Sequence, residues 1–385
     1  MAALQDLELD DKEYVEFLRK LISVSEKVQN APGLGLIPQE NLVSDFVLEE
    51  LKPFTGTELS VERVEFVAGR GNVIIKYAPT SAAKDKTLAF VGSHMDVVPA
   101  NPEGWERDPF TLTVEGDKLY GRGTTDCLGH VALMTCSLLV LFRELAKHKV
   151  QTKTQVVCVL IASEENSEIE GVGVETLMES GKIDFLKNGP VFWVDCSDSQ
   201  PCIGTAGAIT WTLKATGKLF HSGLPNLGIN GLELAMDAMA KIQEHFYKEF
   251  GPVDKEKDPP WAKVAGDMIA KMTAFVDDLN ANITSLEGNR GPVSKYTLPD
   301  ENRKGKLELV FDKSYYEGIA CSLDSTGYNL PLVRDMQRGG FDLTLVGFGK
   351  SSVYHGDNEY CQLSDMKDAM KILALTIANV DAAEK

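Results

Sequence analysis

Three short, continuous apolar runs constrain the fold of this chain most strongly. They are TLAFV at residues 87–91, QVVCVLIA at residues 155–162 and GPVFWV at residues 189–194. A parallel strand is buried on both faces and reads as such a run, and the reactive side chains of open α/β sheets gather just beyond the carboxyl ends of the strands. A strongly apolar helix is expected at residues 128–145. The sequence therefore predicts an α/β fold with a central, mostly parallel sheet between helices.

The first run continues into GSHMD at residues 92–96, which places His94 and Asp96 at the end of a strand. Side chains two apart on a strand share a face, so His94 can hold a metal ion while Asp96 positions the imidazole. A strand-end histidine that only hydrogen-bonds to its neighbour explains these residues on their own at least as well.

Carboxylates and a second histidine follow the other runs. Asp126 stands before the apolar helix, where a carboxylate is either a helix cap or a ligand. Glu164 and Glu165 follow the second run, and because adjacent like charges repel, a cation would explain the pair. Asp195 follows the third run, and His355 follows a strand-like segment near the carboxyl terminus. We expect these side chains to gather at one edge of the sheet.

Arg122 lies between two glycines in GRGTTD at residues 121–126. Glycines permit a tight loop, in which the backbone and the arginine approach a ligand closely. A plain turn is the alternative interpretation.

These positions together offer two imidazoles and three carboxylates: His94, Asp126, Glu165, Asp195 and His355. This set suits a pair of borderline divalent ions such as Zn²⁺ or Co²⁺, and the absence of cysteine from it favours a hydrolytic site over a structural one. Two ions roughly 3.5–4 Å apart can share one carboxylate and one hydroxide. Glu164, which follows the same strand but faces away from Glu165, is then the predicted general base.

Composition limits the partners and the compartment. The length of 385 residues suggests two domains, and the net charge of -18 argues against nucleic acid and anionic membranes while mildly favouring a positively charged substrate. Seven cysteines without a C-x-x-C pair predict free thiols in a reducing compartment. The acidic start has no apolar leader region, and no stretch reaches the roughly 18 apolar residues of a membrane span. We therefore expect a cytoplasmic protein.

The pattern changes in the middle of the chain. From residue 206 the order is strand, helix, charged linker, helix and strand, which suggests a small α+β domain inserted into the α/β domain. The predicted boundaries are a first catalytic part at residues 1–205, an inserted domain at 206–322 and a second catalytic part at 323–385.

Motifs in this order resemble those of the dinuclear zinc amidohydrolases: HMD at 94–96, GRGTTD at 121–126, SEEN at 163–166, the carboxylate of Asp195 and HGDNE at 355–359. This metallopeptidase family includes aminoacylase, carboxypeptidase G and succinyl-diaminopimelate desuccinylase. The resemblance implies a zinc-exopeptidase-like catalytic domain with an inserted lid and dimerisation domain. It also implies a homodimer and a small N-acyl amino acid as substrate.

The resemblance also implies a role for each candidate residue. His94 and Asp195 would bind one ion, Glu165 and His355 the other, and Asp126 would bridge them. Asp96 would orient His94, and Glu164 would take a proton from the attacking water and later give it to the leaving amine. His221, by itself a surface-loop histidine, matches a lid histidine that reaches the scissile carbonyl from the partner subunit as an oxyanion donor. A cis peptide is expected between Asp126 and Cys127.

Within this family, residues 202–236 and 290–311 are similar to the eukaryotic acetylornithine deacetylases. That likeness implies hydrolysis of the N-acetyl amide of N2-acetyl-L-ornithine to ornithine and acetate, in arginine biosynthesis. The alternatives are another N-acyl-amino-acid hydrolase, a dipeptidase, or a catalytically inactive homologue that serves as an interaction partner.

The inserted domain is expected to be shortened. The family lid has the order βαββαβ, but here only GPVDKEKDPP at residues 251–260 stands between the two predicted helices. Ten residues with three prolines cannot form the missing hairpin. A second gap is expected near residues 321–330. A weakly active or inactive homologue is therefore a further alternative.

Overall fold

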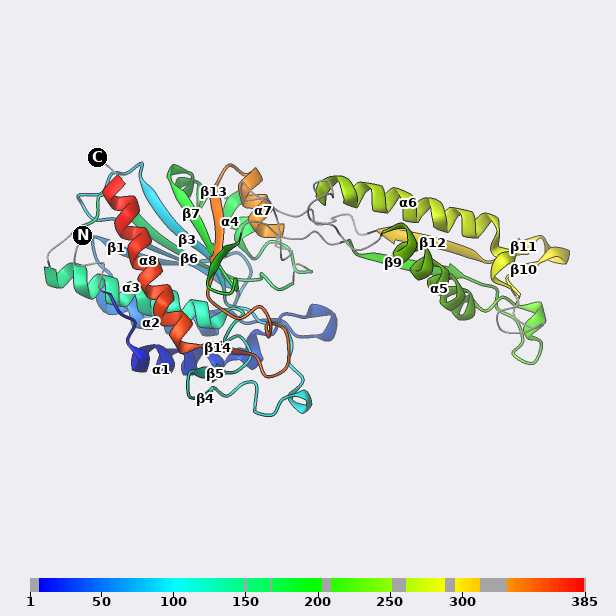
Figure 1. Cartoon of the computed structure of the whole chain (residues 1–385), viewed down its shortest axis with the longest axis horizontal. Coiled ribbons are helices and arrows are strands. Elements are labelled where there is room, and N and C mark those ends of the chain that lie inside the picture. The colour runs from blue at the N-terminus through cyan, green and yellow to red at the C-terminus, as the bar shows by residue number, and fades with distance from the viewer. Residues whose placement is uncertain are drawn as a thin grey trace. The chain divides into compact units, whose positions relative to one another are not determined.

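The computed structural model describes residues 7–148, 151–166, 168–202, 209–250, 261–287, 295–311 and 331–383 (Figure 1). The chain divides into two compact units. Within the described residues, unit 1 comprises those up to 202 and those from 332, and unit 2 comprises residues 209–311 and Pro331.

Unit 1 is built on one seven-stranded sheet in the order β1-β2-β6-β3-β7-β13-β8. Its strands are β1 Leu59–Glu65, β2 Gly71–Tyr77, β3 Thr87–His94, β6 Gln155–Ile161, β7 Pro190–Val194, β8 Gln200–Cys202 and β13 Asp342–Gly347. The four central strands β6, β3, β7 and β13 run parallel to one another. At the edges of the sheet, β2 pairs antiparallel with β6, β1 pairs antiparallel with β2, and β8 pairs antiparallel with β13. Every residue of β3 and β6 is buried, which confirms that the apolar runs are central strands.

Four long helices pack together in unit 1: α1 Asp11–Ile22, α2 Asn41–Leu51, α3 Leu128–His148 and α8 Leu363–Ala383. The others contact α3, which itself lies on β3. Residues 10–25 place apolar side chains at helical spacing behind acidic residues, a pattern that predicts an amphipathic helix. α1 confirms it, and the side chain of Asp10 accepts a hydrogen bond from the Glu13 amide and caps this helix. Two shorter helices, α4 Val174–Glu179 and α7 Pro331–Arg338, are the other α-helices described outside the core of unit 2.

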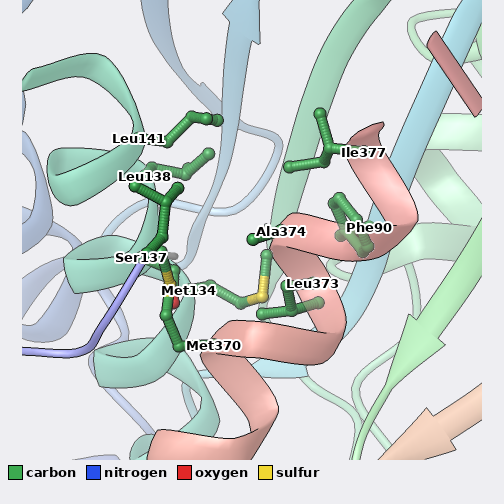
Figure 2. A pocket seen from close by; sticks show the side chains of 10 residues that line it. Phe90, Met134, Ser137, Leu138, Leu141, Met370, Leu373, Ala374 and Ile377 are labelled. Atoms are coloured by element: carbon green, nitrogen blue, oxygen red, sulfur yellow. The ribbon is translucent and has the colours of Figure 1, made fainter. Parts of the chain in front are cut away.

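An apolar seam joins α3 to α8 (Figure 2). Leu138 and Leu141 of α3 face Leu373 and Ile377 of α8, beside Phe90 of β3, around a cavity of about 10 Å³. By length and composition α3 is apolar enough to cross a membrane, although polar and charged residues interrupt its apolar sequence. Since 83% of its apolar window is buried in the protein, we interpret α3 as a core helix.

A small antiparallel sheet in the order β14-β5-β4 lies in the same unit. Its strands are β4 Thr113–Glu115, β5 Lys118–Tyr120 and β14 Tyr360–Gln362. The turn-rich sequence that begins at residue 101 predicts a short hairpin before residue 121, and the antiparallel β4–β5 pair confirms it. Because β14 pairs with β5, the segment after His355 lies beside the loop at residues 121–126.

Unit 2 has its own two-layer core. An antiparallel pair, β9 Trp211–Thr216 with β12 Lys306–Phe311, packs against α5 Gly231–Glu249 and α6 Trp261–Ala281. A two-residue pair, β10 Thr297–Leu298 with β11 Arg303–Lys304, follows α6. The elements β9, α5, α6 and β12 match the predicted order of strand, helix, helix and strand. The linker at residues 251–260 lies outside the described residues, as does the expected gap at 321–330.

Short 3₁₀ turns connect these elements at Ser25–Val28, Pro32–Leu34, Lys52–Phe54, Pro102–Gly104, Asp184–Asn188, Pro225–Leu227, Ile283–Leu286 and Pro299–Glu301. The cysteines of the described residues form no disulfide with one another, as expected.

Candidate metal centre

The carboxyl ends of three neighbouring strands supply most of the candidate site. β3 ends at His94, β6 ends shortly before Glu164 and Glu165, and β7 ends directly before Asp195. Because the sheet order is β6-β3-β7, these ends lie next to one another. Asp126 joins them from the amino end of α3, and His355 joins them from the segment before β14.

The end of β3 depends on a glycine. Gly92 has a φ of +102°, and a Cβ at this position would lie 2.5 Å from the ring of Trp193. The pairing of β3 with β6 shifts between Val91 and His94, which is typical of a bulge that re-aims a side chain. The glycine and the bulge together present His94 at the sheet edge.

Asp126 is the centre of the cluster. Its Oδ1 lies 2.9 Å from His94 Nε2, and its Oδ2 lies 3.0 Å from His355 Nε2. Glu165 Oε2 lies 3.1 Å from the same His355 nitrogen. The potential ligand atoms form two groups, each with all members within 4.8 Å of one another, and these are His94, Asp126, Cys127 and Asp195, and Asp126, Glu165 and His355. The two groups share Asp126, as a bridging ligand requires.

Asp96 ties the ends of two strands together. The ring Nδ1 of His94 lies 3.0 Å from the Asp96 carbonyl oxygen and 3.4 Å from Oδ1. The Asp96 carboxylate accepts hydrogen bonds from the backbone amides of Glu164 and Glu165, each at 3.0 Å. Asn30 Nδ2 donates to Asp96 Oδ2 at 2.7 Å. The sequence analysis missed Asn30, which belongs to no motif that could have revealed it.

The electrostatics of the cluster favour a cation. Burial and the charge of Asp126 raise the pKa of Glu165 to about 7 and that of Asp195 to about 6. Burial alone would raise the pKa of Asp126 as well, but hydrogen bonds from His355 and His94 hold it well below its usual range. Negative charge in this cluster therefore exceeds what its imidazoles can balance.

The residues fit a pair of divalent ions. Glu165 Oε1 is buried and has no hydrogen-bond partner among the described residues, so a bound ion would satisfy it. Carboxylate oxygens and imidazole nitrogens suit Zn²⁺ or Co²⁺. Cys127 also lies within the first group. Burial raises the pKa of its thiol well above the usual value, and this favours the protonated, weakly ligating form.

Comparison with known proteins places this architecture. The sequence profile of Peptidase family M20/M25/M40 matches residues 90–379. The chain belongs to this family. It is 43% identical to an acetylornithine deacetylase of Arabidopsis thaliana, over 97% of this chain and 96% of that protein. It is 44% identical to an acetylornithine deacetylase of Dictyostelium discoideum, over 96% and 97%. A tripeptidase structure from Staphylococcus aureus shares the fold, with a TM-score of 0.64, 14% identity and coverage of 98% and 100%.

The alignment of this M20 chain with the Arabidopsis protein contains more positions than the number of residues that this chain contributes to it. The alignment extends over 433 positions, whereas 97% of the 385 residues is only about 373 residues. About 60 aligned positions, the difference between 433 and 373, therefore hold no residue of this chain. The expected internal shortening agrees with this difference.

Glu164 lies beside the two ligand groups of the M20 site but belongs to neither. Its Oε2 is 3.8 Å from His94 Nε2. Burial raises its pKa well above the usual value, and the neighbouring carboxylates of Asp195 and Glu165 add to this effect. A glutamate that is easily protonated next to a ligand cluster suits proton transfer. The cis peptide expected between Asp126 and Cys127 is present.

Two other candidates lie elsewhere. His221 is an exposed loop residue of unit 2, where its Nδ1 accepts a hydrogen bond from the Gly223 amide at 3.1 Å. Its role at the carbonyl stays a prediction. Arg122 is 1% exposed and donates from Nη1 to Glu359 Oε2 at 2.6 Å, so its guanidinium is held inside the protein.

Proposed function

We propose that this chain is a metal-dependent amidohydrolase that converts N2-acetyl-L-ornithine to ornithine and acetate in arginine biosynthesis. One observation carries the chemistry: the two carboxylate oxygens of Asp126 face the imidazoles of His94 and His355, next to Glu164. The substrate is proposed from the two acetylornithine deacetylases, each more than 40% identical over nearly the whole chain. The net charge of -18 suits a substrate with a free ammonium group.

The ligand assignment follows the two groups of side chains. We propose that His94 and Asp195 hold one ion, that Glu165 and His355 hold the other, and that Asp126 is shared. Zn²⁺ and Co²⁺ both suit these ligands. When bound, such ions lower the pKa of a water molecule toward 7 and polarise the amide carbonyl.

Glu164 is proposed as the general base and acid. Its carboxylate takes a proton from the attacking water and returns that proton to the nitrogen of the leaving amine. Asp96 keeps the base in place, because its carboxylate accepts hydrogen bonds from the backbone amides of Glu164 and Glu165. Its carbonyl and carboxylate oxygens also face His94 Nδ1. The base and one ligand are thus fixed by the same residue.

Unit 2 is proposed as the lid and dimerisation domain of a cytoplasmic homodimer. In this arrangement the partner subunit's His221 donates a hydrogen bond to the developing oxyanion. The catalytic domain then corresponds to the predicted segments 1–205 and 323–385, and the lid corresponds to residues 206–322. These assignments rest on the family resemblance.

A weakly active or inactive homologue is the second candidate. It is favoured by the roughly 60 positions of the Arabidopsis protein that this chain lacks. In the described part of unit 2, the sheet that supports the helices contains two strands, β9 and β12, whereas the family lid has four. A lid that lacks the central strands would lose contacts for the substrate and for the partner subunit.

An activity screen separates these candidates. Zinc- or cobalt-loaded protein is assayed against N-acetyl-ornithine, N-acetyl-methionine and succinyl-diaminopimelate. The proposal expects the highest kcat/KM for N-acetyl-ornithine. Preference for another substrate would reassign the specificity, and a folded, metal-loaded protein inactive on all three would favour the inactive homologue.

A further inference from the structure

We propose that Glu359 is a positioning residue of the metal centre, which holds the loop at residues 121–126 so that Asp126 presents one oxygen to each ion. This inference rests on the proposed function for the presence of two ions. It does not depend on the identity of the substrate.

Glu359 is fully buried and binds several backbone amides of this loop at once. Its Oε1 accepts hydrogen bonds from Thr125 N at 2.8 Å and from Asp126 N at 3.0 Å. Gly123 N lies 3.2 Å from both carboxylate oxygens. Glu359 therefore binds the backbone of the loop, including the peptide nitrogen of Asp126, the shared ligand.

The same segment also carries the second imidazole. His355 precedes Glu359 by four residues and lies 3.0 Å from Asp126 Oδ2. The Glu359 carbonyl accepts a hydrogen bond from Gly121 N at 3.0 Å, and the Tyr360 carbonyl accepts one from Thr125 Oγ1 at 2.9 Å. These contacts join the segment with His355 to the loop with Asp126, so the relative position of the two ligands depends on this junction.

The charge of Glu359 matters for this role. The groups that hydrogen-bond to its carboxylate in the described structure are donors: the loop amides and Arg122 Nη1, which donates at 2.6 Å. A carboxylate accepts through both oxygens, whereas a neutral amide has one acceptor oxygen and would turn its NH₂ group toward a donor. Substitution by glutamine thus preserves the size of the side chain and disrupts the grip on the loop.

The chain offers a matched control for the loss of a buried ion pair. Glu40 is fully buried, and it accepts hydrogen bonds from Arg70 Nη2 at 2.6 Å and Nε at 2.9 Å. The contacts described for its carboxylate involve Arg70 and no candidate ligand. E40Q therefore removes a comparable ion pair without touching the loop of Asp126.

The test compares zinc affinity, by competition with a chelator, and the Tm of the metal-free protein for wild type, E359Q, E359D and E40Q. We expect both glutamine variants to lower the Tm. E359Q should weaken zinc binding about 10- to 100-fold, whereas E40Q should keep the wild-type affinity. E359D keeps the charge but is one methylene shorter, so it should show an intermediate loss, and it carries the test if E359Q does not fold.

Wild-type zinc affinity in folded E359Q or E359D would overturn the inference, as would an equal loss in E40Q. A wild-type protein that binds two ions but does not hydrolyse N-acetyl-ornithine would remove the proposed substrate only. The affinity comparison would still decide the role of Glu359.

Discussion

Asp126 is buried and Glu164 is partly buried, but their neighbours give the two carboxylates opposite properties. The imidazoles of His94 and His355 hold the pKa of Asp126 well below its usual range, so it stays ionised as a ligand. Burial dominates at Glu164 and raises its pKa, so it can carry a proton. The division between ligand and proton carrier therefore follows from which side chains each carboxylate touches.

Replacement of Glu164 by glutamine tests the proposed base. We expect turnover to fall about 10²- to 10⁴-fold while the zinc content stays at the wild-type level, because an amide cannot accept and return the proton. Turnover is measured at saturating N-acetyl-ornithine, together with the zinc content. E165Q is the matched control, since it should lose zinc. Zinc loss in E164Q would mean that the roles of the two glutamates are reversed.

His221→Ala tests the proposed oxyanion donor. Turnover should fall about 10²- to 10³-fold, as commonly follows the loss of one such donor, with zinc content and fold unchanged. His148→Ala, at another exposed histidine, should retain wild-type turnover. Unchanged kinetics in His221→Ala would return this residue to an ordinary loop histidine.

Sequence reasoning could find residues that carry chemistry at strand ends, but not their supporting contacts. His94, Asp126 and Glu165 follow or precede recognisable elements, and the structure brings them together. Asn30 contacts Asp96 across 66 positions of the chain, and Glu359 contacts Asp126 across 233. No local pattern encodes such contacts, because only the tertiary fold brings these segments together.

At the scale of elements, the seam between α3 and α8 stabilises the unit that holds the candidate site. Leu138→Ala should lower the free energy of unfolding by about 2–5 kcal/mol, because it enlarges a cavity inside a packed core. Leu375→Ala on α8 is the control, because Leu375 is 41% exposed and its truncation should change stability by less than about 0.5 kcal/mol. Denaturant unfolding of both variants checks this. Equal effects would show that the seam is not a packed core.

Long or fully buried elements were predictable, whereas the short strands β8 and β14 were not. The structure confirms β3 and β6, which the sequence marks as continuous apolar runs. It also confirms α1, which the sequence marks by apolar residues at helical spacing. β8 and β14 are strands of three residues that exist because they pair with β13 and β5. Such pairing depends on distant segments, so a single stretch of sequence carries no signal for it.

At the scale of the whole molecule, the chain combines a complete set of candidate ligands with a shortened sequence. Unit 1 contains the five proposed ligands, while about 60 positions of the Arabidopsis relative have no counterpart here. We therefore expect metal binding and turnover to be separable in this protein. The proposed site requires metal binding, and the activity screen determines how much turnover the chain has.

The number of zinc ions bound per chain decides whether Asp126 is shared by two ions. Wild-type protein and Asp126→Ala are loaded with zinc, dialysed and measured by elemental analysis. We predict about two ions per wild-type chain and fewer than one in Asp126→Ala, because the substitution removes a ligand from both ions. A wild-type chain that holds one ion or none, or an Asp126→Ala variant that keeps two, would contradict it.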